Sequence, residues 1–547
     1  MATAVLRTQQ TTAKAGRAEA ITHYALALLP FTFMLVMRHL VPHYLDNEAG
    51  KLVATRQVLD PSFLSHDWAV ARGAGDNVFD LVFATVIAPL WLFLHQGLLV
   101  AIAARLLCWS LLTAALVRLT RTLGIEWYAL AISLFAWITS QQNLGAGEWI
   151  FGGAEAKCFA YALIFLAIDA ALKRRLVRSG LFCGMAILCH MLVGSWATLA
   201  LGIAVLPQYR LYGRRKLAAF FAVVALACLP VGVIASSYHS AGTPEEHRTA
   251  QKLAVLLSDP YHLDPTYFHG FREAFILVAL AIATIYMLFK ITSRERAVLL
   301  SSMLAVLALE FLAGLAAWRL GCFWFLNAFP FRVADVLILL FFLLTFPCFT
   351  FRTLSDALRR RTQAVRPFRP GQAGRIFALP CLLILAMPAI AFKNVPKVLA
   401  RDVPRFFVFW HQFPLRQPTP WQEMARWIGT NTPADATFLT PPWEPRFWLD
   451  AERAQVVNYK RAPHSILLLE WQRRLIAVNG GPLLTRGYEV PEELRLSYPH
   501  LTKEQILALH DSCGADYYLA MEEHPDLKAS LVHQNGSYFL YRLGQVR

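Results

Sequence analysis

The sequence predicts a polytopic α-helical membrane protein of about eleven spans that ends in a small α/β domain outside the cytoplasm. Two observations predict this fold class. Hydrophobic residues make up 56% of the 547 positions and charged residues only 16%, well below the roughly one quarter of charged residues in soluble domains. Apolar segments alternate with short polar connectors for about 390 residues, and a mixed, charged pattern follows them.

The charge of the connectors predicts which side of the membrane each one occupies. Basic loops stay on the cytoplasmic side of a bacterial inner membrane because their transfer across it is costly. This rule places the N-terminal tail (1–20) in the cytoplasm and residues 401–547 on the periplasmic side of the plasma membrane. The basic connectors are Arg118/Arg121, Lys173–Arg178, Arg214–Lys216, Lys290–Arg296 and Arg352–Arg361, and the acidic or mixed ones are 42–77, 141–156, 237–271 and 319–330.

The apolar segments define a transmembrane domain (21–400) with a long first outer loop (42–97). Segment 78–95 is apolar enough to span, but we predict an in-plane interfacial helix, because a span would move the basic connector at Arg118 outside. For the same reason 180–207 is predicted to be a hairpin of two short helices that turns near Leu192–Ser195. The predicted spans are 21–41, 98–117, 126–140, 157–172, 180–193, 195–207, 217–236, 272–290, 297–318, 331–351 and 376–392.

The tail is predicted to fold as a separate α/β domain because helix and strand patterns alternate along it. Thr419–Gln422 and Thr502–Gln505 are capping boxes that start helices. Asn535-Gly536 is a hairpin signal between two short strands. The predicted strands are 436–440, 455–459, 516–521, 531–534 and 538–541, and the predicted helices begin near 420, 466 and 503.

The remaining composition excludes several functional classes. The formal net charge of +16 comes from residues at segment ends and not from one basic stripe, so nucleic acid is not an expected partner. The nine cysteines lie mostly in apolar stretches without paired spacing, which argues against a disulfide framework or a zinc site. The outer loops carry no Asp-x-Asp signature, so no cofactor is indicated and a divalent cation stays an open alternative.

Ionisable residues at the outer ends of apolar segments are the candidate site, because such residues usually face a polar cavity or each other. A carboxylate could deprotonate an acceptor hydroxyl or amine, and Arg or Lys could bind a lipid-linked phosphate that departs. The candidates are Asp46, Glu48, Asp67, Glu148, Glu155, Lys157, His190, Arg319, Arg332 and Asp335, with no metal ligands among them.

Most of these residues also have a structural interpretation. Asp46 and Glu48 could be solvated juxtamembrane acids, and Asp67 could cap the segment that follows it. Glu155 and Lys157 could pair within one helical turn, Arg332 and Asp335 could form a structural ion pair, and His190 could be a buried, hydrogen-bonded histidine. The loop histidines His239, His247, His262 and His269 lack metal-ligand spacing, and we expect them to be solvated.

The arrangement resembles the GT-C superfamily of polytopic glycosyltransferases, which use polyprenyl-phosphate or polyprenyl-diphosphate sugar donors. The resemblance covers most of the chain through pattern and spacing. It rests on Asp46-Asn47-Glu48 after the first span, the interfacial stretch Asp80–His95, Ala104–Leu107 and Leu116–Arg121 in the second span, Glu155 before the fourth span, Lys173-Arg174-Arg175, the Gly180–Trp196 hairpin, and the tail stretches Trp421–Pro442 and Gly514–Arg542.

The resemblance implies an inverting glycosyltransferase at the extracytoplasmic face, with a catalytic base at Asp46 or Glu48. Asn47 interrupts the adjacent acidic pair that the family often has there. The second-loop acid of the family corresponds to Glu155, and Lys157, Arg319 and Arg332 are candidates to bind the donor phosphate.

The partners that the resemblance implies are a polyprenyl-phosphate-linked sugar donor, a glycan or lipid acceptor, and membrane lipids. Two alternatives stay open at this point. One is a non-catalytic GT-C-like scaffold for polysaccharide or glycolipid assembly, and the other is a transporter of a lipid-linked substrate.

Overall fold

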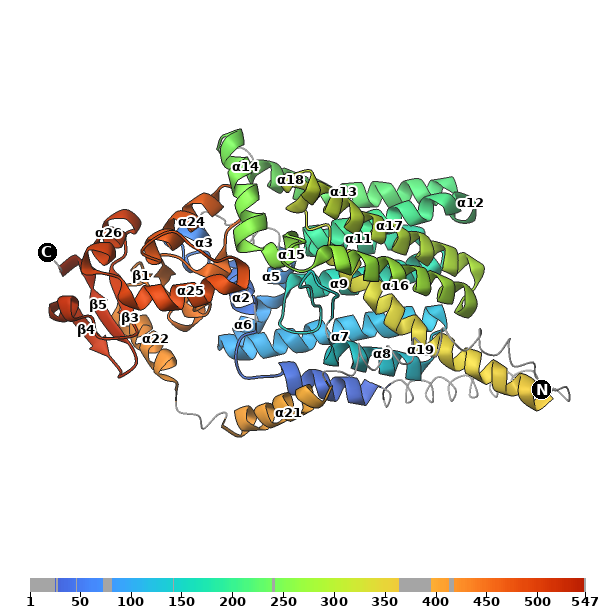
Figure 1. The fold of residues 1–547 in the computed structure, drawn as a ribbon, viewed down its shortest axis with the longest axis horizontal. Helices are drawn as coiled ribbons and strands as arrows, with labels where there is room; N and C mark the ends of the chain where they lie inside the picture. The colour runs from blue at the N-terminus through green and yellow to red at the C-terminus, as the bar shows by residue number, and fades with distance from the viewer. Residues whose placement is uncertain are drawn as a thin grey trace.

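The computed structural model of the chain describes residues 25, 28–45, 47–71, 81–140, 142–238, 242–363, 395–412 and 418–545. It shows a bundle of long helices with a smaller domain that contains a β-sheet at one end (Figure 1). The predicted fold class, a mostly helical chain with a C-terminal α/β domain, is confirmed.

The bundle contains a helix for every predicted span in the described residues, while the predicted span 376–392 lies outside them. Within the described part, six helices are long and apolar enough to cross a membrane. The helix α19 is apolar on all sides because it runs through the centre of the bundle, where 94% of its apolar window is buried. The bundle helices are Leu28–His39 (called the first helix here), α7 (Gly97–Leu123), α8 (Trp127–Thr139), α9 (Ala156–Leu172), α10 (Leu176–Cys189), α11 (Met191–Val205), α13 (Arg214–Tyr238), α16 (Gly270–Ile291), α17 (Arg294–Arg319) and α19 (Arg332–Gln363).

The two segments with ambiguous patterns are both broken into short helices. Residues 81–94 form α5 (Leu81–Ile87) and α6 (Pro89–Leu94), neither of which has the length of a span. The predicted hairpin is present as α10 and α11, with its turn at His190, just before the predicted turn. A Cβ on Gly194 would lie 2.4 Å from the backbone nitrogen of Ile187, so only glycine allows α11 to fold back this closely on α10.

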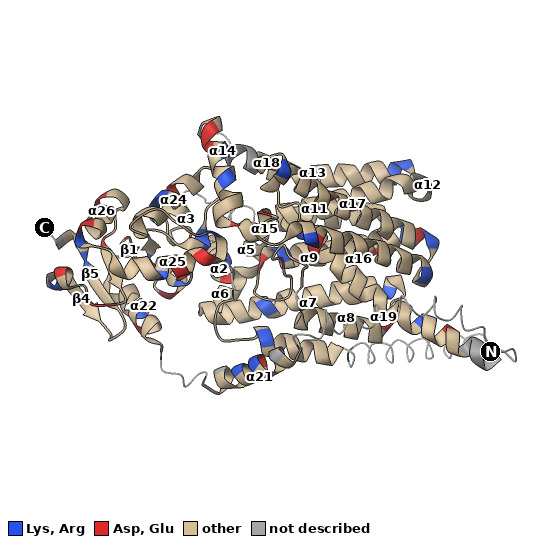
Figure 2. Cartoon of the chain, in the orientation of Figure 1, with Lys and Arg blue, Asp and Glu red and all other residues tan. Residues whose placement is uncertain are grey.

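The basic connectors lie at the end of the bundle that is farthest from the sheet domain. Figure 2 shows Lys and Arg at the end of α7, at the start of α13 and between α16 and α17, all on that side. Three of the four acidic or mixed connectors form short helices at the other end of the bundle, while the described residues 142–155 of the fourth form no helix. These are α2 (Glu48–Leu59), α3 (Trp68–Ala71), α14 (Pro244–Leu253), α15 (Pro260–Leu263) and α18 (Phe323–Leu326).

The tail contains a five-stranded sheet in the order β2-β1-β3-β5-β4, in which β2, β1 and β3 are parallel and β5 and β4 are antiparallel. Both predicted capping boxes are formed, at Thr419 and at Thr502. The strands are β1 (Thr437–Leu439), β2 (Ala454–Gln455), β3 (Tyr517–Ala520), β4 (Leu531–Gln534) and β5 (Phe539–Arg542), and the helices are α22 (Pro420–Asn431), α23 (Phe447–Asp450), α24 (Leu467–Val478), α25 (Val490–Ser497) and α26 (Lys503–Cys513).

The second strand is shorter than the predicted 455–459. The Asn458 side chain accepts a hydrogen bond from the Lys460 backbone N–H (2.9 Å) and starts a 3-10 turn at Tyr459–Arg461. Such a local side-chain bond competes with strand pairing. The turn carries two cations toward the bundle.

The helix α21 (Val395–Gln412) connects the two parts and includes residue 401, where the sequence predicts the domain boundary. Trp410 donates its indole N–H to the Leu40 carbonyl (2.7 Å), and Asp402 lies 3.9 Å from the Arg38 guanidinium. The helix therefore packs beside the end of the first helix, as Figure 1 shows.

Candidate active site

Glu48, a predicted catalytic carboxylate, forms a buried ion pair with Arg105 of α7. Both side chains are fully buried, and the Arg105 Nε donates to Glu48 Oε1 over 2.8 Å. Glu48 also accepts hydrogen bonds from the backbone N–H groups of Leu45 (3.0 Å) and Ala154 (2.8 Å). Burial raises the pKa of Glu48, and the hydrogen bonds from Arg105 oppose this effect. Each oxygen is therefore occupied, and Glu48 joins the first loop to the second.

Arg105 organises the first outer loop, a role that was not predicted from its place in the family pattern. Its guanidinium donates to the carbonyls of His39, Val41 and His43 as well as to Glu48. A fully buried guanidinium requires this many acceptors, because an unpaired buried charge is costly. The chain between the first helix and α2 is therefore wrapped around one side chain.

Asp46, the other predicted base, lies outside the described residues, but both of its neighbours are placed. The Leu45 side chain and carbonyl lie 3.3 Å from the position of a Cβ on Gly153, so the first and second loops are in contact here. The Asn47 carbonyl accepts a hydrogen bond from Arg461 of the tail (3.1 Å).

Asp67 connects the first loop to the tail. One of its oxygens accepts from the backbone N–H groups of Ala69 (2.9 Å) and Val70 (3.1 Å) at the start of α3. The other oxygen accepts from the Trp448 indole (2.9 Å) and the Gln455 backbone N–H (2.9 Å) of the tail. This fully buried side chain has the geometry of a cap, and it also holds the sheet domain in place.

Four of the predicted residues form one buried cluster, which we call the charge cluster: Glu148, Glu155, Lys157 and Arg332. The Lys157 Nζ lies 3.5 Å from Glu148 and 3.3 Å from Glu155, and the Arg332 Nε lies 2.6 Å from Glu148. Lys157 also lies over the Trp149 ring at 3.8 Å from its centroid. The two cations come from the starts of two bundle helices, α9 and α19.

The charge cluster retains unused hydrogen-bonding capacity. Within the described residues, both Glu148 oxygens and the Arg332 Nε are ion-paired (Glu148 lies 2.6 Å from Arg332 and 3.5 Å from Lys157) but make no aligned hydrogen bond, and Glu155 Oε1 makes none either. The nearby Tyr161 hydroxyl is also buried without a partner in that part of the chain. Buried polar groups are nearly always hydrogen-bonded, so such a concentration is typical of a site that receives a polar ligand or ordered water.

Asp335 and His262 position the second loop beside the charge cluster. Asp335 accepts hydrogen bonds from the backbone N–H groups of Leu144 (2.7 Å) and Ala146 (2.8 Å). The Nδ1 of His262 bonds to the Ala146 carbonyl (2.5 Å). Burial, with a smaller effect of Arg332, lowers the pKa of His262 and so favours the neutral ring. The expectation that His262 is solvated was wrong, because α15 folds it under the tail at 8% exposure.

Two further candidates lie at the edges of this region. His190 caps α11 by accepting from the Val193 backbone N–H (3.3 Å), and its ring is within electrostatic range of Arg332 and Lys157. Arg319 ends α17 and lies over the Phe271 ring at 4.8 Å from its centroid. Arg319 makes no contact with the charge cluster in the described part of the chain.

The tail also contributes basic and aromatic residues to this end of the bundle. Lys460 lies over the Tyr488 ring at 5.2 Å, and Tyr488 stacks on Tyr261 of α15 with centroids 4.2 Å apart. Arg486 donates to Asp264 (2.6 Å) across the same junction. Among the described residues, no group of three or more His, Cys, Asp or Glu side chains could hold a metal ion.

Comparisons with known proteins give one partial sequence match. Residues 419–478 match a domain of unknown function, DUF6798. The matched segment includes Trp448 and Gln455, which donate hydrogen bonds to Asp67, and the 3-10 turn at Tyr459–Arg461. No curated protein sequence matches the chain.

Among the solved structures similar to the chain are three membrane transferases. One is ArnT from Cupriavidus metallidurans bound to undecaprenyl phosphate, with 11% identity, 96% of this chain and 98% of that chain covered, and a TM-score of 0.45. Two more are the oligosaccharyltransferase AglB of Archaeoglobus fulgidus with an inhibitory peptide and a dolichol-phosphate (12% identity, 92% of this chain and 69% of that chain covered, TM-score 0.46), and an apo form of an oligosaccharyltransferase from that organism (10% identity, 92% and 69% covered, TM-score 0.43). Similarity at this low identity and TM-score carries no functional argument, so the proposal below rests on the side chains of this protein.

Proposed function

We propose that the protein is an inverting membrane glycosyltransferase that moves a sugar from a polyprenyl-phosphate-linked donor to a glycan or lipid acceptor at the extracytoplasmic face. The observation that carries the proposal is the charge cluster, in which two cations and two carboxylates are buried with unused hydrogen-bonding capacity. Lys157 and Arg332 lie in the first turns of α9 and α19, whose opposite ends lead to the basic connectors, so the positive-inside rule predicts an extracytoplasmic position for the cluster.

Lys157 and Arg332 are the groups that would receive the donor phosphate. Arg offers a planar fork of N–H donors that matches phosphate oxygens, and Lys offers a compact positive charge. Both belong to the first turns of their helices, where the helix dipole also favours an anion. Stabilisation of the departing phosphate in a site without bulk water is the largest contribution that this geometry supports.

In the transfer step, the acceptor oxygen attacks the anomeric carbon as the bond from that carbon to the phosphate oxygen breaks. The bonding electron pair leaves with the phosphate, and the acceptor proton moves to a carboxylate. Asp46 and Glu155 are the proposed bases, because the family resemblance implies a base at Asp46 and because Glu155 Oε1 has no aligned hydrogen bond within the described residues. Glu48 is proposed as a positioning residue that acts through Arg105, since its oxygens are already occupied.

The test uses the full-length protein in proteoliposomes with a polyprenyl-phosphate-linked sugar fraction that carries a radiolabelled sugar. Lys157→Gln and Arg332→Gln should each reduce transfer by 100-fold or more, as the loss of a group that stabilises developing charge does. The exposed pair Lys528–Glu523 supplies the control, Lys528→Gln, which should keep full activity. Full transfer by both cluster variants would refute the proposal.

Asp46→Asn and Glu155→Gln separate the two proposed bases. The variant that lacks the base should bind fluorescent undecaprenyl phosphate normally and should transfer at less than 1% of the wild-type rate. The other variant should keep most of its activity. Normal transfer by both variants would exclude a base at either position.

The same experiment addresses the scaffold alternative, which one observation favours. The charge cluster is electrically neutral as it stands, and Glu48 is fully paired. A scaffold would bind undecaprenyl phosphate in a manner that depends on Lys157 and Arg332, and no substrate fraction would yield transfer.

A further inference from the structure

Tyr161, a residue that the proposed mechanism does not use, lies one helical turn after Lys157 in α9. Residues four apart share one face of a helix, and a long side chain leans toward the N-terminal turn, so the hydroxyl is directed toward the turn that carries Lys157. Both side chains are buried, at 0% and 4% exposure. The hydroxyl is also within electrostatic range of Glu148 and Arg332, so it belongs to the surroundings of the charge cluster.

The Tyr161 hydroxyl makes no hydrogen bond within the part of the chain that the structure describes. Other buried tyrosines are paired. The Tyr212 hydroxyl donates to the Ala171 carbonyl (3.2 Å). The Tyr498 hydroxyl donates to the Leu519 carbonyl (2.9 Å). A buried tyrosine hydroxyl usually finds such a partner, because its removal from water is otherwise not compensated. Tyr161 therefore presents an unused donor beside the charge cluster.

The charged groups around this hydroxyl are already engaged. Asp335 accepts hydrogen bonds from the backbone N–H groups of residues 144–146. The Arg332 guanidinium can only donate. Glu148 is ion-paired with Arg332 and Lys157, and the Tyr161 hydroxyl does not donate to it. An oxygen that arrives with a ligand would supply the acceptor that this arrangement lacks.

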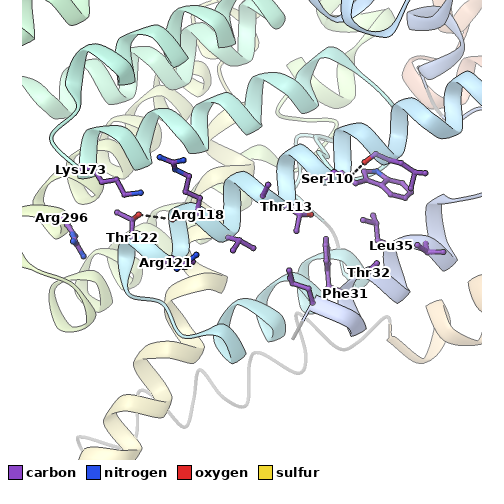
Figure 3. Close-up of a pocket in the computed structure, with 16 residues that line it drawn as sticks. Phe31, Thr32, Leu35, Ser110, Thr113, Arg118, Arg121, Thr122, Lys173 and Arg296 are labelled. Carbon is purple, nitrogen blue, oxygen red and sulfur yellow. Dashed lines mark hydrogen bonds between the residues drawn. The ribbon is translucent and has the colours of Figure 1, made fainter. Parts of the chain in front are cut away.

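A groove of about 1110 Å³ beside the first helix and α7 does not supply that acceptor either (Figure 3). The described residues that line it include Phe31, Thr113 and Arg118, but neither Tyr161 nor any member of the charge cluster. Water that fills this groove is therefore not the partner of the hydroxyl.

We propose that Tyr161 is a third donor to the phosphate of the lipid-linked sugar, beside Lys157 and Arg332; this inference rests on the proposed function. The hydroxyl donates to a non-bridging phosphate oxygen and keeps its own proton throughout the transfer. The phosphate gains negative charge as its bond to the sugar breaks, so this hydrogen bond is stronger in the transition state than in the bound donor. Tyr161 therefore contributes both to the affinity for the donor and to the rate of transfer.

The test compares Tyr161→Phe with the wild type, because this change removes only the hydroxyl. The full-length protein in detergent micelles is titrated with fluorescent undecaprenyl phosphate, and its unfolding by sodium dodecyl sulfate is followed by circular dichroism. The Kd for the lipid phosphate should rise about 10- to 100-fold, as the loss of a hydrogen bond to a charged group does. The unfolding midpoint without the lipid should not fall, because the hydroxyl has no partner among the described residues.

Tyr212→Phe is the matched control. It makes the same change in α12 (Tyr209–Tyr212), where the hydroxyl binds the opposite end of α9 at the Ala171 carbonyl. This control should show the opposite pattern, with a lower unfolding midpoint and an unchanged Kd. A loss of stability in Tyr161→Phe as large as in the control would show a structural hydrogen bond and would overturn the inference.

The cluster variants separate a failure of this inference from a failure of the proposed function. If Lys157→Gln and Arg332→Gln bind the lipid phosphate weakly while Tyr161→Phe keeps wild-type affinity and transfer, only the role of Tyr161 is overturned, and its hydroxyl holds an ordered water. If all three variants bind and transfer as the wild type does, the phosphate site itself is refuted.

Discussion

Replacement of Glu48 by Gln distinguishes a structural role for this residue from a catalytic one. Glu48 and Arg105 are both fully buried, and the glutamate accepts from the guanidinium and from two backbone N–H groups. A carboxamide keeps the shape of the side chain, but it removes the negative charge and turns one acceptor into a donor that faces other donors. The Arg105 charge then stays buried without a counter-charge.

Removal of one partner from a buried ion pair costs about 3–5 kcal/mol. We therefore expect Glu48→Gln to lower the free energy of unfolding by this amount, measured from circular dichroism during titration of mixed micelles with sodium dodecyl sulfate. The matched control is Glu452→Gln, which removes the acid from a pair with Arg56 whose side chains are 44% and 28% exposed. Exposed pairs contribute about 0–1 kcal/mol, so the control should unfold at nearly the wild-type midpoint.

A wild-type unfolding midpoint for Glu48→Gln would refute this reasoning. If transfer activity were lost at the same time, Glu48 would be the base and not a positioning residue. A large loss of stability together with residual transfer in the folded fraction would agree with the role inferred from its contacts.

Three further predictions concern the tail and its junction with the bundle. Asp67→Ala should speed hydrogen exchange at Gln455 at least tenfold and raise the exposure of Trp448 to acrylamide quenching, because both lose their acceptor; unchanged exchange would show that the tail is held elsewhere. Arg473 and Arg474 lower the pKa of Glu470 to about 2. The contribution of Glu470 to stability is therefore present above the unfolded-state pKa of 4.5 and is lost as the pH falls toward 2. Glu470→Gln should remove this part of the acid dependence, and an acid unfolding profile identical to that of the wild type would contradict the prediction. Burial lowers the pKa of His262 from 6.5, so the unfolded chain binds the proton more strongly than the folded protein. Stability should therefore fall as the pH drops below about 6.5. A His262→Asn variant, whose amide can still donate to the Ala146 carbonyl, should lose less stability between pH 7 and pH 5, measured by thermal unfolding.

The elements that depend on local pattern could be predicted from the sequence. The capping boxes at Thr419 and Thr502 start helices, the alternation of basic and acidic connectors separates the two ends of the bundle, and 180–207 is a hairpin. These features follow from hydrogen bonding within a few residues or from the electrostatics of insertion, and both are encoded in short stretches of the chain.

The partners of individual residues could not be predicted, because they depend on which distant segments meet. Glu48 was predicted to be a base from its position after the first span, and its ion pair with Arg105, 57 residues away, was not foreseen. His262 was expected in solvent because its surroundings in the sequence are polar, yet α15 and the tail bury it. The gathering of Glu148, Lys157 and Arg332 could be suspected only from their common location at the outer ends of spans.

The position of Asp67 constrains how this protein could be recombined with its relatives. One carboxylate begins a helix of the first loop and also receives the indole and the strand amide of the sheet domain. A chimera that exchanges only the C-terminal part would leave this acid facing foreign side chains, with buried charge and no donors. We expect functional exchange only when the donor protein supplies both pieces together, so the N-terminal loop and the C-terminal domain should be inherited as a pair.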